Sequence, residues 1–190
     1  MENFNDKRSA RSFFLKKRRL LTQTEAQTLS ARLCENICAS EYFRNSDTLL
    51  LYSATRGEPD LSMLANVALE CGKKVAFPIS QTDTCTLDFR TVNSLDELKE
   101  GTYKILEPTD NTPHAEISEK TLCIVPALAV DKNGFRLGYG KGYYDRFLRN
   151  FTGYSICAIS SEHFISDLPK DNNDVPVDAI ITETGVIHKK

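Results

Sequence analysis

The chain has 190 residues, a hydrophobic fraction of 41% and a formal net charge of −2. This length suits one domain that buries about 70% of its unfolded surface, so neither disulfides nor a structural metal are needed for stability. The near-neutral charge gives no general attraction to nucleic acid or to a membrane surface, and the longest apolar runs are too short to cross a bilayer.

The N-terminus and the cysteines predict a cytoplasmic protein with reduced thiols. Residues 1–19 contain no apolar core and no small-residue cleavage site, so we expect no secretory signal, and the acidic Glu2 and Asp6 disfavour a transit peptide. The six cysteines form no C-x-x-C pair, which argues against a zinc site. Cys123 and Cys157 are predicted to be small buried hydrophobic residues. Three histidines lie far apart and are predicted to be solvated loop residues: His114, His163 and His188.

Helices and strands alternate along the first half of the chain. A basic helix is predicted over 6–20, and Thr22 with Glu25 forms a capping box that begins a second helix over 25–40. The other predicted elements of this half are a strand over 48–54, a helix from Asp60 to Gly72, strands over 74–80 and 85–92, and a short helix over 95–100 with a Ser94–Glu97 capping box.

In the second half of the chain, the residue pattern predicts a central strand over 121–130, a turn over 131–134, a helix over 143–150 and strands over 154–160 and 177–183. Alternating helices and apolar strands indicate an α/β domain over 1–190, with a mostly parallel central sheet and helices on both faces. Ligands of such sheets bind beyond the carboxyl ends of the strands. We therefore expect three loops to meet there: the loop with Glu58, the loop after Val130 and the loop after Ser160.

The stretch "RLGYGKGYYDRFL", residues 136–148, places three of the nine glycines at alternate positions directly before a predicted helix. Glycines between a strand and a helix let backbone amides approach an anion. The spacing matches neither the P-loop nor G-x-G-x-x-G, so by itself it fits a phosphate-binding loop or a tight turn. Arg136 and Lys141 place two cations beside the glycines, which favours the phosphate-binding loop.

The residues that follow the glycines are open to two interpretations each. Asp145 is either a partner of the helix dipole or, beside a polyphosphate, a ligand of Mg²⁺. Tyr143 pairs with Phe147 and Tyr144 with Leu148 at i,i+4 spacing. One pair is expected in the core, and the tyrosine of the other pair presents its hydroxyl to the loop.

The basic N-terminal helix has a predicted charged face and a predicted packed face. Lys7, Arg11 and Arg18 fall on one face of a 3.6-residue helix. Phe13 and Leu20 fall on another face and are predicted to pack onto the sheet domain. A helix anchored in this way would direct Lys7 and Arg11 toward the mouth of the site.

Segments along nearly the whole chain resemble the 5-formyltetrahydrofolate cyclo-ligase family. The most specific is "IVPALAVDKNGFRLGYGKGYYDRFL", residues 124–148, which is similar to the family signature. The other matching positions are Lys7 and Arg11 in the first helix, Glu58 in "RGEPD", the pair Glu107-Pro108, and Asp174 and Asp178 in "PKDNNDVPVD". At Asn173 some members of the family have histidine, so this position carries no weight.

The resemblance implies an ATP-dependent ligase with a fold related to the sugar-phosphate isomerase and CoA-transferase group. In the family reaction, ATP phosphorylates the formyl oxygen of 5-formyltetrahydrofolate. Nitrogen 10 then attacks the activated carbon, and the products are 5,10-methenyltetrahydrofolate, ADP and phosphate. The partners implied are Mg²⁺, ATP and the folate, with or without a polyglutamate tail, and we expect a monomer.

The resemblance also implies roles for individual residues. Those that would bind ATP are Lys7, Arg11, Arg136, Leu137, Gly138, Tyr139, Gly140, Lys141, Gly142, Tyr143 and Tyr144, of which Arg136 and Tyr144 would be catalytic. Those that would bind the folate are Glu58, Tyr139 and Tyr143. Those that would hold Mg²⁺ are Asp145 and Asp174, with Asp178 as the alternative to Asp174.

Two other functions remain open from the sequence. A protein with the same fold could bind ATP but act on another substrate, although Glu58 and the complete tyrosine–aspartate run argue against this. A nucleic-acid-binding module could use the seven Lys and Arg residues within 7–19. Such a charge run is usually a solvated face, and no RNA-stacking or helix-turn-helix motif accompanies it.

Overall fold

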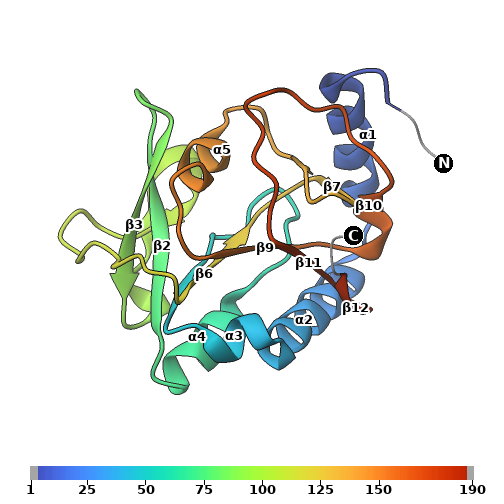
Figure 1. Cartoon of the computed structure of the whole chain (residues 1–190). Coiled ribbons are helices and arrows are strands. Elements are labelled where there is room, and N and C mark those ends of the chain that lie inside the picture. The colour runs from blue at the N-terminus through green and yellow to red at the C-terminus, as the bar shows by residue number, and fades with distance from the viewer. Residues whose placement is uncertain (1–3, 188–190) are drawn as a thin grey trace.

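One seven-stranded sheet runs through the computed structural model, which describes residues 4–187 (Figure 1). The strand order is β12-β11-β9-β6-β1-β2-β3. Neighbouring strands from β11 to β2 are parallel, whereas the edge strands β12 and β3 are antiparallel to their neighbours. The predicted, mostly parallel sheet is therefore confirmed. Its strands are β1 (Thr48–Leu50), β2 (Lys74–Gln81), β3 (Thr86–Val92), β6 (Thr121–Val125), β9 (Tyr154–Ala158), β11 (Ala179–Thr182) and β12 (Gly185–Ile187).

Five α-helices and two smaller sheets surround this sheet in the described residues. The helices are α1 (Lys7–Arg19), α2 (Gln23–Ala39), α3 (Glu41–Asn45), α4 (Ser62–Glu70) and α5 (Tyr143–Leu148). One small sheet contains β7 (Ala129–Asp131), β8 (Arg136–Leu137) and β10 (Phe164–Ile165), and the other contains β4 (Lys99–Glu100) and β5 (Leu106–Glu107). The capping box predicted at the start of α2 forms, because Glu25 Oε2 accepts from Thr22 N at 2.8 Å and Thr22 Oγ1 accepts from Glu25 N at 3.3 Å.

Helices cover both faces of the large sheet, as predicted. Alternate strand residues point to opposite faces, so Leu49 and Leu51 pack in one core with α2 and α4, whereas Leu50 packs in another with Leu148 of α5. Figure 1 shows α2, α3 and α4 on one side of the sheet and α5 on the other. The two cores hold the strands in register and leave their carboxyl ends free for the site.

The N-terminal helix α1 packs on the small sheet rather than on the large one, and it does so with a different face from the predicted one. Ala10 and Phe14 are fully buried against residues of β7 and β8, whereas Phe13 is 36% exposed and Leu20 is 73% exposed. The prediction for Phe13 and Leu20 is therefore wrong. Residues 7, 11, 14 and 18 share one helix face, so the face that carries the predicted cations is also the packed face.

The apolar run 121–130 forms two strands in two sheets, so the prediction of one central strand is wrong. β6 ends at Val125 in the large sheet, and β7 begins at Ala129 in the small sheet. Pro126 has no backbone N–H to donate to a ladder. After it the chain leaves the large sheet, and Leu128 N donates to Leu137 O at 2.7 Å.

Two predicted helix starts also differ in the structure. Residues 95–100 form a 3₁₀ turn (Leu95–Glu97) followed by β4, not a helix. The predicted Ser94–Glu97 capping box does not form, because Ser94 Oγ accepts from Asp96 N and Glu97 Oε1 accepts from Asn93 N. Leu61 is the N-cap of α4, and Asp60 Oδ1 instead accepts from Ser62 N at 2.9 Å. The predicted end at Gly72 is confirmed by its left-handed φ of 74° just after the helix.

His163 is buried rather than solvated, which corrects the prediction for that residue. Its side chain packs on Phe14 with ring centroids 5.2 Å apart, and Nδ1 lies 2.7 Å from Leu128 O. Burial lowers the pKa of His163 to about 4, so the ring is neutral near pH 7. His114 is exposed as predicted, and His188 lies outside the described residues.

The predicted burial of Cys123 and Cys157 is confirmed. All six cysteines are free thiols, and Cys123 and Cys157 are fully buried. Burial raises the pKa of Cys157 to about 12, so this thiol stays protonated and unreactive. Separately, none of the helices in residues 4–187 combines the length and the apolar character that crossing a membrane requires.

We expect Gly153→Ala to destabilise the fold by about 1–3 kcal/mol or more, the usual cost of overpacking. A Cβ at Gly153 would lie 2.2 Å from Thr121 O and 3.0 Å from Ser118 O, and backbone atoms cannot move aside as a flexible side chain can. Urea unfolding measures the change. Gly138→Ala is the matched control, because nothing lies within 4 Å of its added Cβ. Equal stabilities of the two variants would contradict the steric explanation.

Candidate active site

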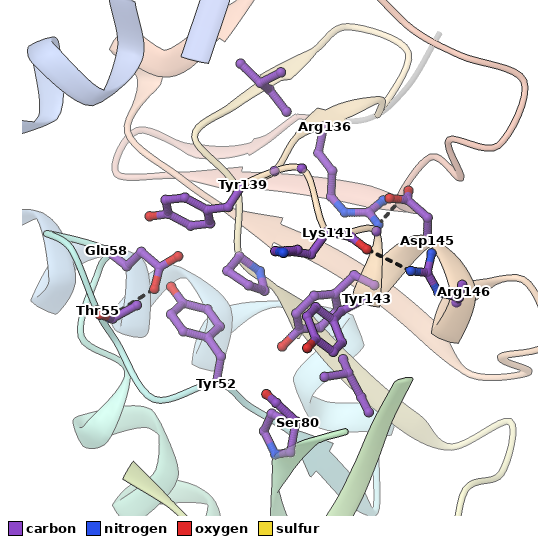
Figure 2. Close-up of a pocket in the computed structure, with 18 of the residues that line it drawn as sticks. Tyr52, Thr55, Glu58, Ser80, Arg136, Tyr139, Lys141, Tyr143, Asp145 and Arg146 are labelled. Atoms are coloured by element: carbon purple, nitrogen blue, oxygen red, sulfur yellow. Dashed lines mark hydrogen bonds and ion pairs between the residues drawn. The ribbon is translucent and has the colours of Figure 1, made fainter. Parts of the chain in front are cut away.

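A cavity of about 770 Å³ lies between α1, the loop after β1, the glycine loop before α5 and the segment 171–174 (Figure 2). Every residue that the sequence predicted for the site lines it, except Asp178, the alternative metal ligand. These residues are Lys7, Arg11, Glu58, Arg136, Leu137, Gly138, Tyr139, Gly140, Lys141, Gly142, Tyr143, Tyr144, Asp145 and Asp174. The loop with Glu58, the loop after Val130 and the loop after Ser160 therefore meet as expected. The loop after Ser160 contributes residues 171, 173 and 174.

The glycine loop takes conformations that side chains rarely adopt. Gly140 and Gly142 have φ values of 96° and 69°, in the region open mainly to glycine. The Arg11 side chain lies against the loop: its Nε donates to Gly138 O at 2.8 Å, and a Cβ on Gly140 would lie 3.3 Å from Arg11 Cζ. Glycine thus lets the cation of α1 approach the loop backbone.

Arg136 and Asp145 form an ion pair across the glycine loop. Arg136 Nη2 lies 3.0 Å from Asp145 Oδ1, and the Arg136 side chain is only 4% exposed. Asp145 Oδ1 also accepts from Val175 N at 3.2 Å. Within residues 4–187, Asp145 Oδ2 has no hydrogen-bond partner, so this oxygen is the one available to a ligand in the cavity.

Lys7 joins the start of α1 to segment 171–174. Its Nζ lies 2.6 Å from Asp171 Oδ2 and 2.6 Å from Asp174 Oδ2, and Asp174 Oδ2 also accepts from Asp171 N at 2.7 Å. Lys7, predicted to bind phosphate, and Asp174, predicted to bind Mg²⁺, therefore form an ion pair with each other. Asp178 does not line the cavity, and its Oδ2 accepts from both N and Oγ of Ser155 at 2.8 Å.

Glu58 reaches the cavity from a tight turn. Arg56 and Gly57 have φ values of 51° and 74°, and Glu58 Oε2 accepts from Thr55 N at 3.0 Å. Burial raises the pKa of Glu58, while the Thr55 N–H and the positive charge of Arg18 oppose this effect. Figure 2 shows Glu58, Tyr52 and Tyr139 together on one side of the cavity and Arg136, Asp145 and Arg146 on the other.

The three tyrosines of the glycine segment have different surroundings. Tyr144 packs with Leu148 in the core on the α5 side of the sheet, and burial raises its pKa well above the usual value. Tyr139 accepts from Arg18 Nη1 at 3.1 Å, and the Arg56 guanidinium lies 5.2 Å from the centre of its ring. The hydroxyl of Tyr143 is buried and has no hydrogen-bond partner in the described part of the chain. A buried hydroxyl without a partner is costly, so Tyr143 is suited to contact a ligand in the cavity.

Several cavity residues were given no role by the sequence. They are Tyr52, Arg56, Ser80, Glu107, Arg146, Arg149 and Asp171. Arg18 does not line the cavity, but it donates to Tyr139, which does. The pair Glu107-Pro108 was a family match, and the structure shows that the buried Glu107 accepts from Ser80 N at 3.2 Å and from Thr102 N at 3.1 Å. The helical spacing placed Arg18 on one face with Lys7 and Arg11, but its burial depends on distant partners and could not be predicted from that spacing.

The cavity is more positive than the rest of the molecule. Seven Lys and Arg residues and five carboxylates line it, although the chain as a whole has a net charge of −2. In residues 4–187, no three His, Cys, Asp or Glu side chains are grouped closely enough to hold a metal ion by themselves. The arrangement therefore suits a polyanion that brings its own oxygen ligands for a cation.

Comparison with known proteins gives a consistent result. The model of the 5-formyltetrahydrofolate cyclo-ligase family matches residues 3–183. The probable 5-formyltetrahydrofolate cyclo-ligase of Caenorhabditis elegans is 29% identical over 180 residues, which cover 88% of this chain and 87% of the relative. The 5-formyltetrahydrofolate cyclo-ligase of Escherichia coli K12 is 27% identical over 90% of this chain and 96% of its own. The solved structure of Aquifex aeolicus 5,10-methenyltetrahydrofolate synthetase superimposes with a TM-score of 0.86 at 31% identity, covering 97% of this chain and 93% of that one.

Proposed function

The chain belongs to the 5-formyltetrahydrofolate cyclo-ligase family, and we propose that it uses ATP and Mg²⁺ to convert 5-formyltetrahydrofolate into 5,10-methenyltetrahydrofolate, ADP and phosphate. The observation that carries this proposal is the single cavity that gathers the glycine loop, the excess of cations and Glu58. A triphosphate suits the cationic part, and a ring with N–H donors suits the carboxylate of Glu58.

Phosphoryl transfer depends mainly on positioning and on neutralising charge. In the proposed reaction Lys7, Arg11 and Lys141 neutralise the phosphates, and the amides of residues 138–142 approach them closely. Arg136 stabilises the charge of the transferring phosphoryl group, while the Tyr144 hydroxyl orients the reacting atoms. Since nitrogen 10 of the folate attacks the activated carbon, no nucleophile from the enzyme is needed.

The residues present fit a magnesium ion bound together with ATP. Asp145 offers Oδ2, and Asp174 offers a second carboxylate from the neighbouring segment, whose Val175 N donates to Asp145 Oδ1. Mg²⁺ prefers one or two carboxylates completed by phosphate oxygens, which suits a site without a larger carboxylate cluster. When bound, the ion would neutralise charge on the triphosphate.

The direct test mixes the protein with Mg-ATP and 5-formyltetrahydrofolate at neutral pH and follows the near-ultraviolet absorbance of the methenyl product together with ADP. We expect both products to appear in equal amounts, and neither to appear without ATP. Absence of both products would reject the proposed function. ATP binding without methenyl formation would instead favour the same fold acting on another substrate.

Glu58→Gln should raise the KM for 5-formyltetrahydrofolate at least about tenfold, equivalent to ~1.4 kcal/mol, and leave the KM for ATP nearly unchanged. The amide keeps the shape of the turn but removes the charge that strengthens hydrogen bonds from the pterin ring. Saturation curves for each substrate at a fixed high concentration of the other measure the two constants. Glu70→Gln, in an exposed position at the end of α4, serves as the control. An equal change in both constants would make Glu58 a structural residue.

A further inference from the structure

Arg18 is a buried cation that the proposed reaction does not use. The residue is 5% exposed, and no carboxylate in the described chain lies within ion-pair distance of it. Its guanidinium donates from Nη1 to Tyr139 Oη at 3.1 Å and from Nη2 to Ala127 O at 2.5 Å. A buried charge without a direct ion pair is costly, so its position calls for an explanation.

The loop that carries Glu58 packs directly on the Arg18 side chain. A Cβ on Gly57 would lie 3.2 Å from Arg18 Cγ and 3.4 Å from Arg18 Cδ. Arg18 therefore contacts the Glu58 loop through its aliphatic stem and the glycine loop through its guanidinium. These two loops form the folate side of the proposed site.

Charged and titratable groups surround Glu58 from five elements. Arg18 faces it from α1, Arg56 from its own loop, and Tyr52, Tyr139 and Tyr144 from the end of β1, the glycine loop and α5. The tyrosine hydroxyls are neutral near pH 7, and burial raises their pKa values further above the usual range. His163, which faces Arg18, is also neutral. Arg18 and the more exposed Arg56 are thus the positive charges that act on Glu58.

We propose that Arg18 is a positioning residue for the folate side of the cavity, where it fixes the Tyr139 hydroxyl and keeps the Glu58 carboxylate charged. The inference rests on the proposed function, because it gives Glu58 the task of accepting hydrogen bonds from the pterin ring. It also gives α1 two separate tasks. Lys7 and Arg11 act on the phosphates, and Arg18 acts on the folate from the other end of the same helix face.

The proposal fixes the direction of a pH effect. Burial raises the pKa of Glu58, and the charge of Arg18 opposes that rise. Without Arg18 the pKa of Glu58 rises further. Since the charged carboxylate accepts the pterin hydrogen bonds, folate affinity falls as the pH drops through this pKa. The loss therefore begins at a higher pH in a variant without the Arg18 charge.

The experiment compares Arg18→Met with Arg19→Met, an exposed neighbour on the same helix. We measure KM for 5-formyltetrahydrofolate and for ATP between pH 5.5 and 8. Arg18→Met should raise the folate constant at pH 6 at least about tenfold, keep the ATP constant within about twofold, and move the acidic limb of the folate profile to higher pH. Arg19→Met should match the wild type throughout. An equal rise in both constants, or an unmoved acidic limb, would leave Arg18 with a packing role only.

Two further variants keep the test valid if Arg18→Met does not fold. Arg18→Lys retains the charge without the two-pronged donor, so the acidic limb should stay near its wild-type position while the folate constant still rises. Tyr139→Phe removes the partner of Arg18 and also the hydroxyl that hydrogen-bonds to Glu58 and lowers its pKa, so the folate constant should rise and the acidic limb should move to higher pH. A shift of the acidic limb in Arg18→Lys, or an unchanged folate constant in Tyr139→Phe, would contradict the proposal.

A readout without turnover separates this inference from the proposed function. Carbon-13 titration of the Glu58 carboxyl group in the free protein, assigned with Glu58→Gln, should give a higher pKa in Arg18→Met, or in a folded Arg18→Gln, than in the wild type. A higher pKa in a protein that makes no methenyl product would reject the proposed function but not the coupling between Arg18 and Glu58. An unchanged pKa in an active enzyme would reject the inference alone.

Discussion

Replacing Asp145 by asparagine should lower turnover about 10²–10³-fold, the usual effect of losing one electrostatic contact to the transition state, while folate binding survives. Asparagine keeps the shape of the side chain and an acceptor oxygen for Arg136 and Val175 N. It removes the negative charge that pairs with Arg136 at 3.0 Å and that offers Oδ2 to the proposed magnesium ion. The substitution therefore acts on phosphoryl transfer and not on the Glu58 side of the cavity.

Two measurements check this expectation: turnover as a function of Mg²⁺ concentration, and the Kd for 5-formyltetrahydrofolate without ATP. Asp167→Asn provides the control, because Asp167 is an exposed aspartate outside the cavity that forms an ion pair with Lys170. Turnover and Mg²⁺ dependence equal to those of the wild type would reduce Asp145 to an orienting partner of Arg136 at the first turn of α5.

Removing both Lys7 and Arg11 by alanine should raise the KM for ATP at least about tenfold, or ~1.4 kcal/mol. One cation near a phosphate contributes up to ~4 kcal/mol at an effective dielectric constant of 20, before desolvation and ordering reduce it. A further reduction comes from the existing contacts of Lys7 with Asp171 and Asp174, which a triphosphate must share or replace. Because these costs reduce the full Coulomb contribution, we expect a rise of at least about tenfold in the KM for ATP, rather than the much larger change that ~4 kcal/mol would give.

The double variant should remain folded, because Ala10 and Phe14 hold α1 on the small sheet. Circular dichroism and thermal unfolding check this, and ATP saturation at fixed folate measures the constant. Arg8→Ala with Lys16→Ala removes two exposed cations from the same helix and is the matched control. If both double variants keep the wild-type ATP constant, Lys7 and Arg11 serve only to anchor α1 to segment 171–174 and to the glycine loop.

Local features of this protein could be predicted because the interacting groups are a few residues apart. The Thr22–Glu25 capping box, the left-handed Gly72 after α4 and the helix that follows the glycine run all form as expected. The same holds for the alternation of strands and helices, which depends on patterns within each segment. The family signature then indicated where the site would be, and its residues 136–146 line one cavity.

Predictions failed where distant partners compete with a local pattern. The run 121–130 is uniformly apolar, but Pro126 and the pairing with β8 divide it between two sheets. Phe13 and Phe14 are equivalent in hydrophobicity, and only the position of β7 and β8 makes Phe14 the buried one. His163 was predicted to be a solvated loop residue, but its contacts with Phe14 and Leu128 O, both distant in sequence, bury it.

By itself the sequence determined the class of the fold, the family and the candidate residues of the proposed site, because each of these is encoded in short segments whose order along the chain is visible. Only the tertiary structure decided how those residues are charged and paired. Lys7 meets Asp171 and Asp174 across more than 160 positions, and Arg18 meets Tyr139 across 121. Such contacts depend on where α1 packs, and that position depends on apolar surfaces contributed by the whole chain.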